Sequence, residues 1–222
     1  MALDVTTKDC TALSDSELAE MADICADGGH CYGVGDLSKQ VELWVLVTLV
    51  REGNHLRGFS FSTLERIGGT PCILVGVASV KRTSKRDTVL RSIISDNFRR
   101  ALMAFPDEDV LLGTRMTSPS GFDGFKNLVD VIPRPEHKPS GEERAWGRRL
   151  AKRFGIESDL YDDQSFTITG DDGVPMVLDH DSLKVDKIPG DVAAQFNHLD
   201  VARGDCLVTC GWIMAEELLK FG

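Results

Sequence analysis

Hydrophobic positions in residues 13–28 recur at the spacing of an amphipathic helix. Ser14, followed by a glutamate three residues later, is typical of a capping box that begins a helix, and Gly28 is typical of its end. The apolar stripe of this helix comprises Leu18, Met21, Ala22 and Cys25. The glycine-bearing segment 27–36 that follows predicts a loop.

Three strand patterns come next. Residues 41–52 are rich in β-branched and aromatic residues, and the glycine and asparagine at 53–54 predict a tight turn. Residues 57–67 alternate phenylalanine with serine, the period of a strand with one face toward a core. After two glycines at 68–69, residues 71–80 are apolar on both faces, as in a central strand. We therefore expect an antiparallel meander of three strands.

A basic hinge, residues 81–87 (KRTSKRD), separates the third strand from a long helical pattern over 88–105. Asp87 or Thr88 is expected to cap this helix. Residues 110–114 then form a short apolar strand. Because a strand, a crossover helix and a strand follow one another, the last strand is expected to run parallel to the strand before the hinge.

The next segment begins with a pattern for a short helix over 117–130 and a proline-rich linker over 131–139. A second capping box, Ser140 with Glu143, begins a basic helix that ends at Gly155.

The last quarter of the chain has a less regular pattern. We expect a hairpin from residues 164–169 and 174–178, and helices over 191–201 and 205–221, although 206–213 alone has the pattern of a strand. Together these patterns predict an α/β (α+β) fold with a mixed, mostly antiparallel central sheet flanked by helices.

Charge is segregated along the chain, whose formal net charge is −10. The net charge is −6 over residues 1–80, +6 over 81–154 and −10 over 155–222. The acidic total argues against nucleic-acid binding, whereas the basic middle third indicates one localised anionic partner. The alternative is that the three segments neutralise one another in the fold.

The six cysteines are too few for a disulfide scaffold in a chain of 222 residues. Neither Cys25, His30 and Cys31 nor the pair Cys206 and Cys210 forms a C-x-x-C motif, and we expect no metal site. The first ten residues lack the pattern of a secretory signal, and no apolar run approaches the length of a membrane helix. We therefore expect a cytoplasmic protein without a membrane partner.

Over residues 14–134 the order of elements resembles that of the GNAT superfamily of N-acyltransferases. The resemblance implies that the strand at 71–80 diverges from the strand at 110–114, and that the opened backbone holds the pantetheine arm of an acyl-CoA. It also implies a GNAT-like core over 1–135 and a C-terminal extension over 136–222 that completes the sheet and covers the cleft.

In this family the loop after the central strand wraps the pyrophosphate of the cofactor. The cofactor-binding residues that the resemblance implies here are Val80, Lys81, Arg82, Thr83, Ser84, Lys85, Arg86 and Thr88. Lys85 and Asp87 stand where the family has small residues, so we expect side-chain charge to replace part of the backbone cradle. Phe122 and Phe125 stand where the family often has a tyrosine that protonates the leaving thiolate.

Acyl transfer to an amine needs a group that removes the ammonium proton. Glu65 is the candidate base, because it lies in a predicted strand beside the expected cleft. The alternative is a structural carboxylate paired with Arg66 or another cation.

Three functions follow from these patterns. The first is an N-acyltransferase that moves an acyl group from acetyl-CoA or a longer acyl-CoA, the small-molecule donor, to an amine of an acceptor that the sequence does not identify. In the second, acyl carrier protein replaces the CoA donor and docks on the basic surface. In the third, a catalytically silent GNAT-like fold serves as a binding module.

Overall fold

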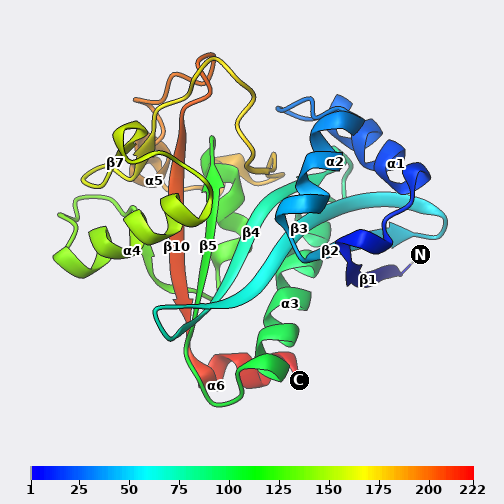
Figure 1. Ribbon diagram of the computed structural model, residues 1–222, viewed down its shortest axis with the longest axis horizontal. Helices are drawn as coiled ribbons and strands as arrows, with labels where there is room; N and C mark the ends of the chain where they lie inside the picture. The colour runs from blue at the N-terminus through cyan, green and yellow to red at the C-terminus, as the bar shows by residue number, and fades with distance from the viewer. Residues whose placement is uncertain (1) are drawn as a thin grey trace.

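One mixed, mostly antiparallel sheet runs through the computed structural model, which describes residues 2–222 (Figure 1). Its strands are β1 (Leu3–Asp9), β2 (Leu46–Glu52), β3 (His55–Ile67), β4 (Thr70–Val80), β5 (Val110–Met116), β6 (Val129–Ile132), β7 (Tyr161–Asp162), β8 (Thr167–Ile168), β9 (Leu178–Asp179) and β10 (Cys206–Ile213). The strand order is β1-β2-β3-β4-β5-β10-β8-β7, with β6 also paired to β10 and β9 paired to β4.

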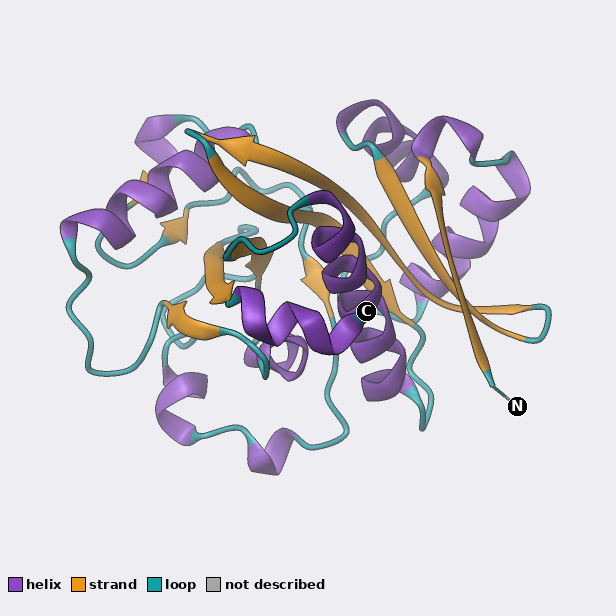
Figure 2. Ribbon diagram, turned by 90° about the horizontal axis from the view of Figure 1, so that it is seen from below, coloured by secondary structure: helices purple, strands orange, loops and turns teal. Residues whose placement is uncertain are grey.

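Helices cover both faces of this sheet. They are α1 (Asp15–Ala26), α2 (Val34–Leu43), α3 (Arg86–Ala104), α4 (Gly141–Arg153), α5 (Gly190–Ala194) and α6 (Ala215–Leu218). Buried side chains of α1, α2 and α4 join one core, and those of α3 and α6 join the other. Figure 2 shows the C-terminal helices packed against α3. No helix within residues 2–222 is long and apolar enough to cross a membrane.

Local sequence signals produced the expected elements in the first part of the chain. Both capping boxes are present, at Ser14 with Glu17 and at Ser140 with Glu143. The meander β2-β3-β4 is antiparallel, and β4 is buried along nearly its whole length. The strand after α3, β5, runs parallel to β4. The mixed, mostly antiparallel sheet flanked by helices confirms the predicted fold class.

Two elements near the N-terminus depart from the prediction. Leu3–Asp9 forms an edge strand that no pattern indicated, and Val34–Leu43 is a helix although its start was predicted as a loop. Gly33 occupies the N-cap position, where its backbone amide donates to the Asp36 carboxylate at 3.2 Å. That bond satisfies the Gly33 amide at the helix start, so a helix begins here where a loop was predicted. Strand β2 consequently begins at Leu46 and not at residue 41.

The long helix also begins differently from the prediction. It starts at Arg86, with Lys85 at the N-cap position and no side-chain cap, so neither Asp87 nor Thr88 caps it. The segment predicted as a short helix contains the 3-10 helix Pro119–Phe125. It continues into β6, which extends into the predicted linker.

The predicted hairpin of residues 164–169 and 174–178 is wrong. Strand β8 pairs with β7 and β10, whereas Leu178–Asp179 pairs with β4. The chain does not turn back after β8 because Gly170 and Asp172 donate backbone hydrogen bonds to the segment around Arg203, at 2.9 Å each.

The predicted helix over 205–221 is mostly strand, as its alternative proposed. Strand β10 lies between β5 and β8, where its alternating side chains contribute to both cores, and only Ala215–Leu218 and the 3-10 turn Leu219–Phe221 are helical. Of the helix predicted over 191–201, only the part within Gly190–Ala194 forms.

Candidate functional site

The central strands β4 and β5 diverge to form a fork. They pair only where Cys72–Leu74 faces Leu111–Gly113, and both strands then continue without pairing to each other. Strand β4 carries a bulge at Gly76, which has no partner in β3. Gly76 is required there, because a Cβ atom would lie 2.0 Å from a ring carbon of Trp44.

Side chains of β5 satisfy carbonyl groups of β4 beyond the last backbone pair. Thr114 Oγ1 donates to the Val75 carbonyl at 2.9 Å, and Arg115 Nη2 donates to the Gly76 carbonyl at 3.3 Å. The Arg115 guanidinium is buried and lies 4.7 Å from the centre of the Phe154 ring. These contacts fix the base of the fork.

A segment of the chain's own C-terminal part fills the fork. We call residues 175–183 the plug segment. Its strand β9 pairs in parallel with Ala78 and Ser79 of β4 and also contacts β5. The Ala78 amide donates to the Val177 carbonyl at 3.2 Å. Val177 and Leu178 are both buried, one in each core, so the plug segment closes the fork from both faces of the sheet.

Tyr32 anchors the start of the plug segment. Its hydroxyl donates to the Pro175 carbonyl at 2.7 Å and accepts from the Val177 amide at 3.2 Å. Burial raises the pKa of Tyr32 well above its ordinary value, so the hydroxyl stays protonated at neutral pH. Tyr32 therefore acts as a fixed donor and acceptor for the plug backbone.

Asp179 ties the middle of the plug segment to the basic hinge. Its carboxylate accepts from Arg82 Nη2 at 2.8 Å and from the Gly29 amide at 3.2 Å, and His30 Nδ1 lies 3.6 Å away. Burial alone would raise the pKa of Asp179, but the neighbouring His30 and Arg82 outweigh burial and hold it below its usual value. Asp179 is therefore a carboxylate at neutral pH, although only 5% of it is exposed.

His180 and Asp87 form a buried pair next to Asp179. His180 Nε2 lies 3.1 Å from Asp87 Oδ1, which also accepts from the Leu183 amide at 3.0 Å. Burial lowers the pKa of His180 despite the neighbouring Asp87 carboxylate, so the imidazole is neutral near pH 7. Asp87, predicted to cap α3, instead binds the plug segment.

Two further cations of the hinge, Lys85 and Arg86, are also paired. Arg86 Nη2 lies 3.1 Å from the Asp181 carboxylate, and Arg86 Nε donates to the Asp181 carbonyl. Lys85 forms an ion pair with Glu52 of β2. Two acidic residues of the plug segment thus neutralise Arg82 and Arg86, the two arginines expected to face a pyrophosphate.

Backbone amides of the hinge are largely used within the protein. Those of Lys81, Thr83 and Arg86 donate to the carbonyls of Arg57, Lys81 and Thr83, respectively, and that of Lys85 donates to Thr83 Oγ1. Val80 is buried and Ser84 is exposed, while Thr88 Oγ1 accepts from Arg91. The loop has the expected position after β4, but it presents few free donors to a phosphate.

Glu65 is not brought together with the hinge. It lies opposite Cys72, and its carboxylate accepts from Arg153 Nε of α4 at 2.6 Å. Along β4, Cys72 and Ala78 are separated by six residues, or about 20 Å of extended strand. Arg66, the other cation considered for Glu65, pairs with Glu108.

Asp87, Asp123 and His180 place potential metal-ligating atoms within 4.8 Å of one another. The two carboxylate oxygens of Asp123 are already engaged by Arg91 and Lys126. Asp87 Oδ1 is engaged by His180 and Leu183. Among the described residues, Asp87 Oδ2 and His180 Nδ1 are buried without a hydrogen-bond partner. The bonds that are made join the cluster to the plug segment.

The sequence patterns did not indicate that five residues outside the hinge hold the plug segment in the fork. They are Tyr32, His30, Asp179, His180 and Asp181. The available signal was the charge segregation, since the acidic C-terminal third supplies the partners of Arg82 and Arg86. A two-residue strand is too short to show a period of its own.

Comparison with known proteins gives similarity in three dimensions only. No family model matches the sequence, and no curated protein matches it. The ribosomal-protein-S18-alanine N-acetyltransferase from Escherichia coli is 8% identical with a TM-score of 0.46, and the match covers 95% of each chain. A chain of the NatC complex bound to Gag peptide and CoA is 13% identical with a TM-score of 0.43, over 58% of this chain and 86% of that chain. An aminoglycoside 6'-N-acetyltransferase from Enterococcus faecium is 9% identical with a TM-score of 0.41, and the match covers 61% of this chain and 68% of that chain.

Similarities at these identities and TM-scores establish neither the family nor the activity of this chain. The sheet itself has the features that the resemblance implied: an antiparallel meander, a crossover helix after β4, and a parallel β5 that diverges from β4. The chain therefore has the mixed, mostly antiparallel sheet that its element order predicted, with its own residues 175–183 seated in the fork.

Proposed function

We propose that this protein is a GNAT-like binding module whose acyl-donor groove is occupied by its own plug segment. The observation that supports this proposal is the pairing of β9 with Ala78 and Ser79 inside the fork. The pantetheine arm of an acyl-CoA would need the same backbone groups of β4. The Ala78 amide already has its acceptor, so the arm and the plug segment compete for one position.

The charges of the plug segment support the same proposal. Asp179 and Asp181 pair with Arg82 and Arg86, the side chains that a pyrophosphate would need. A CoA molecule would have to displace two carboxylates and leave Asp179 without its cation in a buried setting. Breaking a buried ion pair in this way is costly. With Lys85 paired to Glu52, three of the four cations of the hinge are already paired within the protein, which leaves less positive charge for an acidic carrier protein.

Equilibrium binding tests this proposal. Acetyl-CoA and a series of longer acyl-CoAs are titrated into the intact protein, and the heat of binding and the melting temperature are recorded. A ligand that binds only the folded state raises the melting temperature, so we expect no shift and no saturable heat. Saturable binding of any member of the series to the wild-type protein would overturn the proposal.

A second candidate function is N-acyl transfer from acyl-CoA to an amine, performed only when the plug segment leaves the fork. The bulge at Gly76 and the two arginines of the hinge favour it, because they supply the diverging strands and the positive charge that a donor would use. Replacing residues 175–183 by a flexible linker of equal length distinguishes the two functions. Gain of acyl-CoA binding with acylation of a test amine would support the transferase, and gain of neither would support the binding module.

A further inference from the structure

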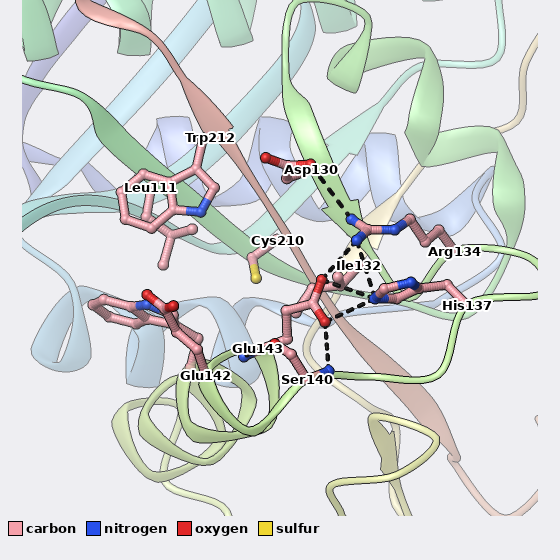
Figure 3. A pocket seen from close by; sticks show the side chains of 11 residues that line it. Leu111, Asp130, Ile132, Arg134, His137, Ser140, Glu142, Glu143, Cys210 and Trp212 are labelled. Atoms are coloured by element: carbon pink, nitrogen blue, oxygen red, sulfur yellow. Dashed lines mark hydrogen bonds and ion pairs between the residues drawn. The ribbon is translucent and has the colours of Figure 1, made fainter.

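A pocket of about 410 Å³ lies beside the sheet on the side of α4, apart from the fork (Figure 3). This volume is within the usual range for small-molecule sites. The pocket lies between β5, β6, β10 and the first turns of α4. Its lining residues are Leu111, Asp130, Ile132, Arg134, His137, Ser140, Glu142, Glu143, Trp146, Cys210 and Trp212.

The cationic residues of this pocket are engaged by one carboxylate. Glu143 accepts from Arg134 Nη2 at 2.9 Å, lies 2.8 Å from His137 Nε2, and accepts from the Ser140 amide at 2.7 Å. Arg134 Nη1 also faces the Asp130 carboxylate at 3.7 Å. Figure 3 shows these contacts as one continuous network on one side of the pocket.

The pocket retains negative charge after this internal pairing. It is lined by three carboxylates and one guanidinium, which together carry a net charge of −2. The Glu142 side chain is exposed and has no hydrogen bond or ion pair to any other residue in the part of the chain that the structure describes. An anionic ligand would therefore be repelled, whereas a cation would be attracted by the unpaired Glu142 carboxylate.

Two tryptophans provide a surface that attracts cations. The rings of Trp146 and Trp212 lie 5.9 Å apart at an angle of 85°. Trp146 already has the Arg149 guanidinium 4.7 Å from its ring centre. Trp212 remains partly exposed at the pocket. Indole faces next to carboxylates are the typical surroundings of bound ammonium groups.

The pocket is separate from the donor groove. Leu111, in the pocket wall, pairs with Cys72 at the closed end of the fork, about 20 Å along β4 from Ala78. A ligand in this pocket would not contact the plug segment at Ala78. Binding here consequently does not depend on whether the groove is open.

We propose that this pocket binds a small organic cation of the quaternary alkylammonium class. The cationic head lies against Trp212 and near Glu142, and the Arg134–Glu143–His137 network contacts polar groups at the other end of the ligand. A quaternary ammonium has no free nitrogen lone pair and accepts no acyl group, so this is a binding site and not an acceptor site for transfer.

Titration of the wild-type protein with choline tests the proposal, with tryptophan fluorescence as the readout. The matched control ligand is the neutral isostere of choline, in which a tert-butyl group replaces the trimethylammonium group. We expect saturable binding of choline and at least about tenfold weaker binding of the isostere, because only the charged head gains from the indole face and the carboxylate. Equal binding of the two ligands, or no saturable binding of choline, would overturn the proposal.

Two variants locate the binding to this pocket. Trp212→Leu should weaken choline binding about tenfold, and Glu142→Gln should weaken it several-fold. The control variant is Glu216→Gln, which removes an exposed carboxylate outside the pocket and should leave the affinity unchanged. Full retention of affinity in both Trp212→Leu and Glu142→Gln would contradict the assignment, and a calorimetric titration checks it independently of fluorescence.

Discussion

The fork between β4 and β5 and the pocket beside α4 belong to the same sheet but differ in how their polar groups are satisfied. In the fork, the two buried titratable side chains of the plug segment each have a partner elsewhere in the chain: Asp179 pairs with Arg82, and His180 pairs with Asp87. In the pocket, Glu142 has no partner within residues 2–222, and Trp212 remains partly exposed. The side chains in the fork are buried in the two cores, whereas those of the pocket include exposed, unpaired groups.

This difference indicates that the fork contributes to the stability of the fold, whereas the pocket is the region available for ligand binding. The groove where an acyl donor is expected is closed by ion pairs and by buried apolar side chains. Ligand entry would break these contacts and so lower the free energy of unfolding. A pocket without any family motif has unmatched charge and exposed aromatic surface. Substitutions in the fork should therefore lower mainly the free energy of unfolding, and substitutions in the pocket should weaken mainly ligand binding.

The largest effect is expected for Asp179→Ala. Removal of this carboxylate leaves the Arg82 guanidinium without its partner and the Gly29 amide without its acceptor. We expect the free energy of unfolding to fall by about 3 kcal/mol, as for other broken buried ion pairs. Urea denaturation followed by circular dichroism measures the change.

Asp181→Ala is the matched control for that variant. Its side chain is 52% exposed, so its pair with Arg86 is screened by solvent, and we expect a loss below about 1 kcal/mol. Equal losses in the two variants would contradict the view that Asp179 is the main anchor of the plug segment.

Gly76→Ala should have the next largest effect. The added Cβ atom would lie 2.0 Å from the Trp44 ring, and both groups are held inside a packed core. Overpacking of this kind costs about 2 kcal/mol in the free energy of unfolding. The control is Gly35→Ala in α2, where no atom lies within 4 Å and alanine is the better helix former, so a gain of about 0.5 kcal/mol is expected from thermal denaturation.

The free energy of unfolding should decrease at acidic pH because His180 of the plug segment takes up a proton. The imidazole faces Asp87, with Arg82 and Asp123 close by, and burial keeps its folded-state pKa below the ordinary value. The unfolded chain therefore takes up the proton first, and the free energy of unfolding should fall as pH drops below about 6.5. Asp179 adds a further loss only below about pH 3.9, because its folded-state pKa is lowered.

Comparison with His180→Gln isolates the first step. The variant lacks the titrating group, so its free energy of unfolding should change less between pH 7 and pH 5 than that of the wild-type protein. Parallel pH profiles for the two proteins would show that His180 does not titrate as its burial implies.

The smallest effect on stability is expected for Glu142→Gln. Glu142 has no partner within the described residues, so the free energy of unfolding should change by less than about 0.5 kcal/mol. The same substitution should weaken choline binding. A large loss of stability would show that Glu142 supports the fold, and would contradict the contrast between pocket and fork.

Much of the fold follows from local signals in the sequence. The capping residues Ser14 and Ser140 begin their helices, and the alternation of Phe59 and Phe61 with serines marks β3. The apolar run of β4 predicts a central strand because both of its faces are buried. Where the helix or strand period extends over several turns or residues, the local pattern and the final packing agree.

The plug segment shows why the site did not follow from the sequence. Leu178–Asp179 is a strand of two residues, and its place on β4 depends on Tyr32, Arg82 and His30, which are far away in the chain. Adjacent residues 164–169 supplied a plausible but incorrect partner for it. Glu65, chosen for its place in β3, remains a prediction, and its carboxylate lies beside Arg153.

Hydrogen exchange at the Ala78 amide tests the central claim most directly. This amide donates to the Val177 carbonyl of the plug segment and would lose that acceptor if the fork were open. The account predicts protection close to that of the core amides of β4, unchanged by excess acetyl-CoA. Rapid exchange of Ala78 in the free protein, or a change in its exchange rate on addition of acetyl-CoA, would contradict a groove that the chain itself occupies.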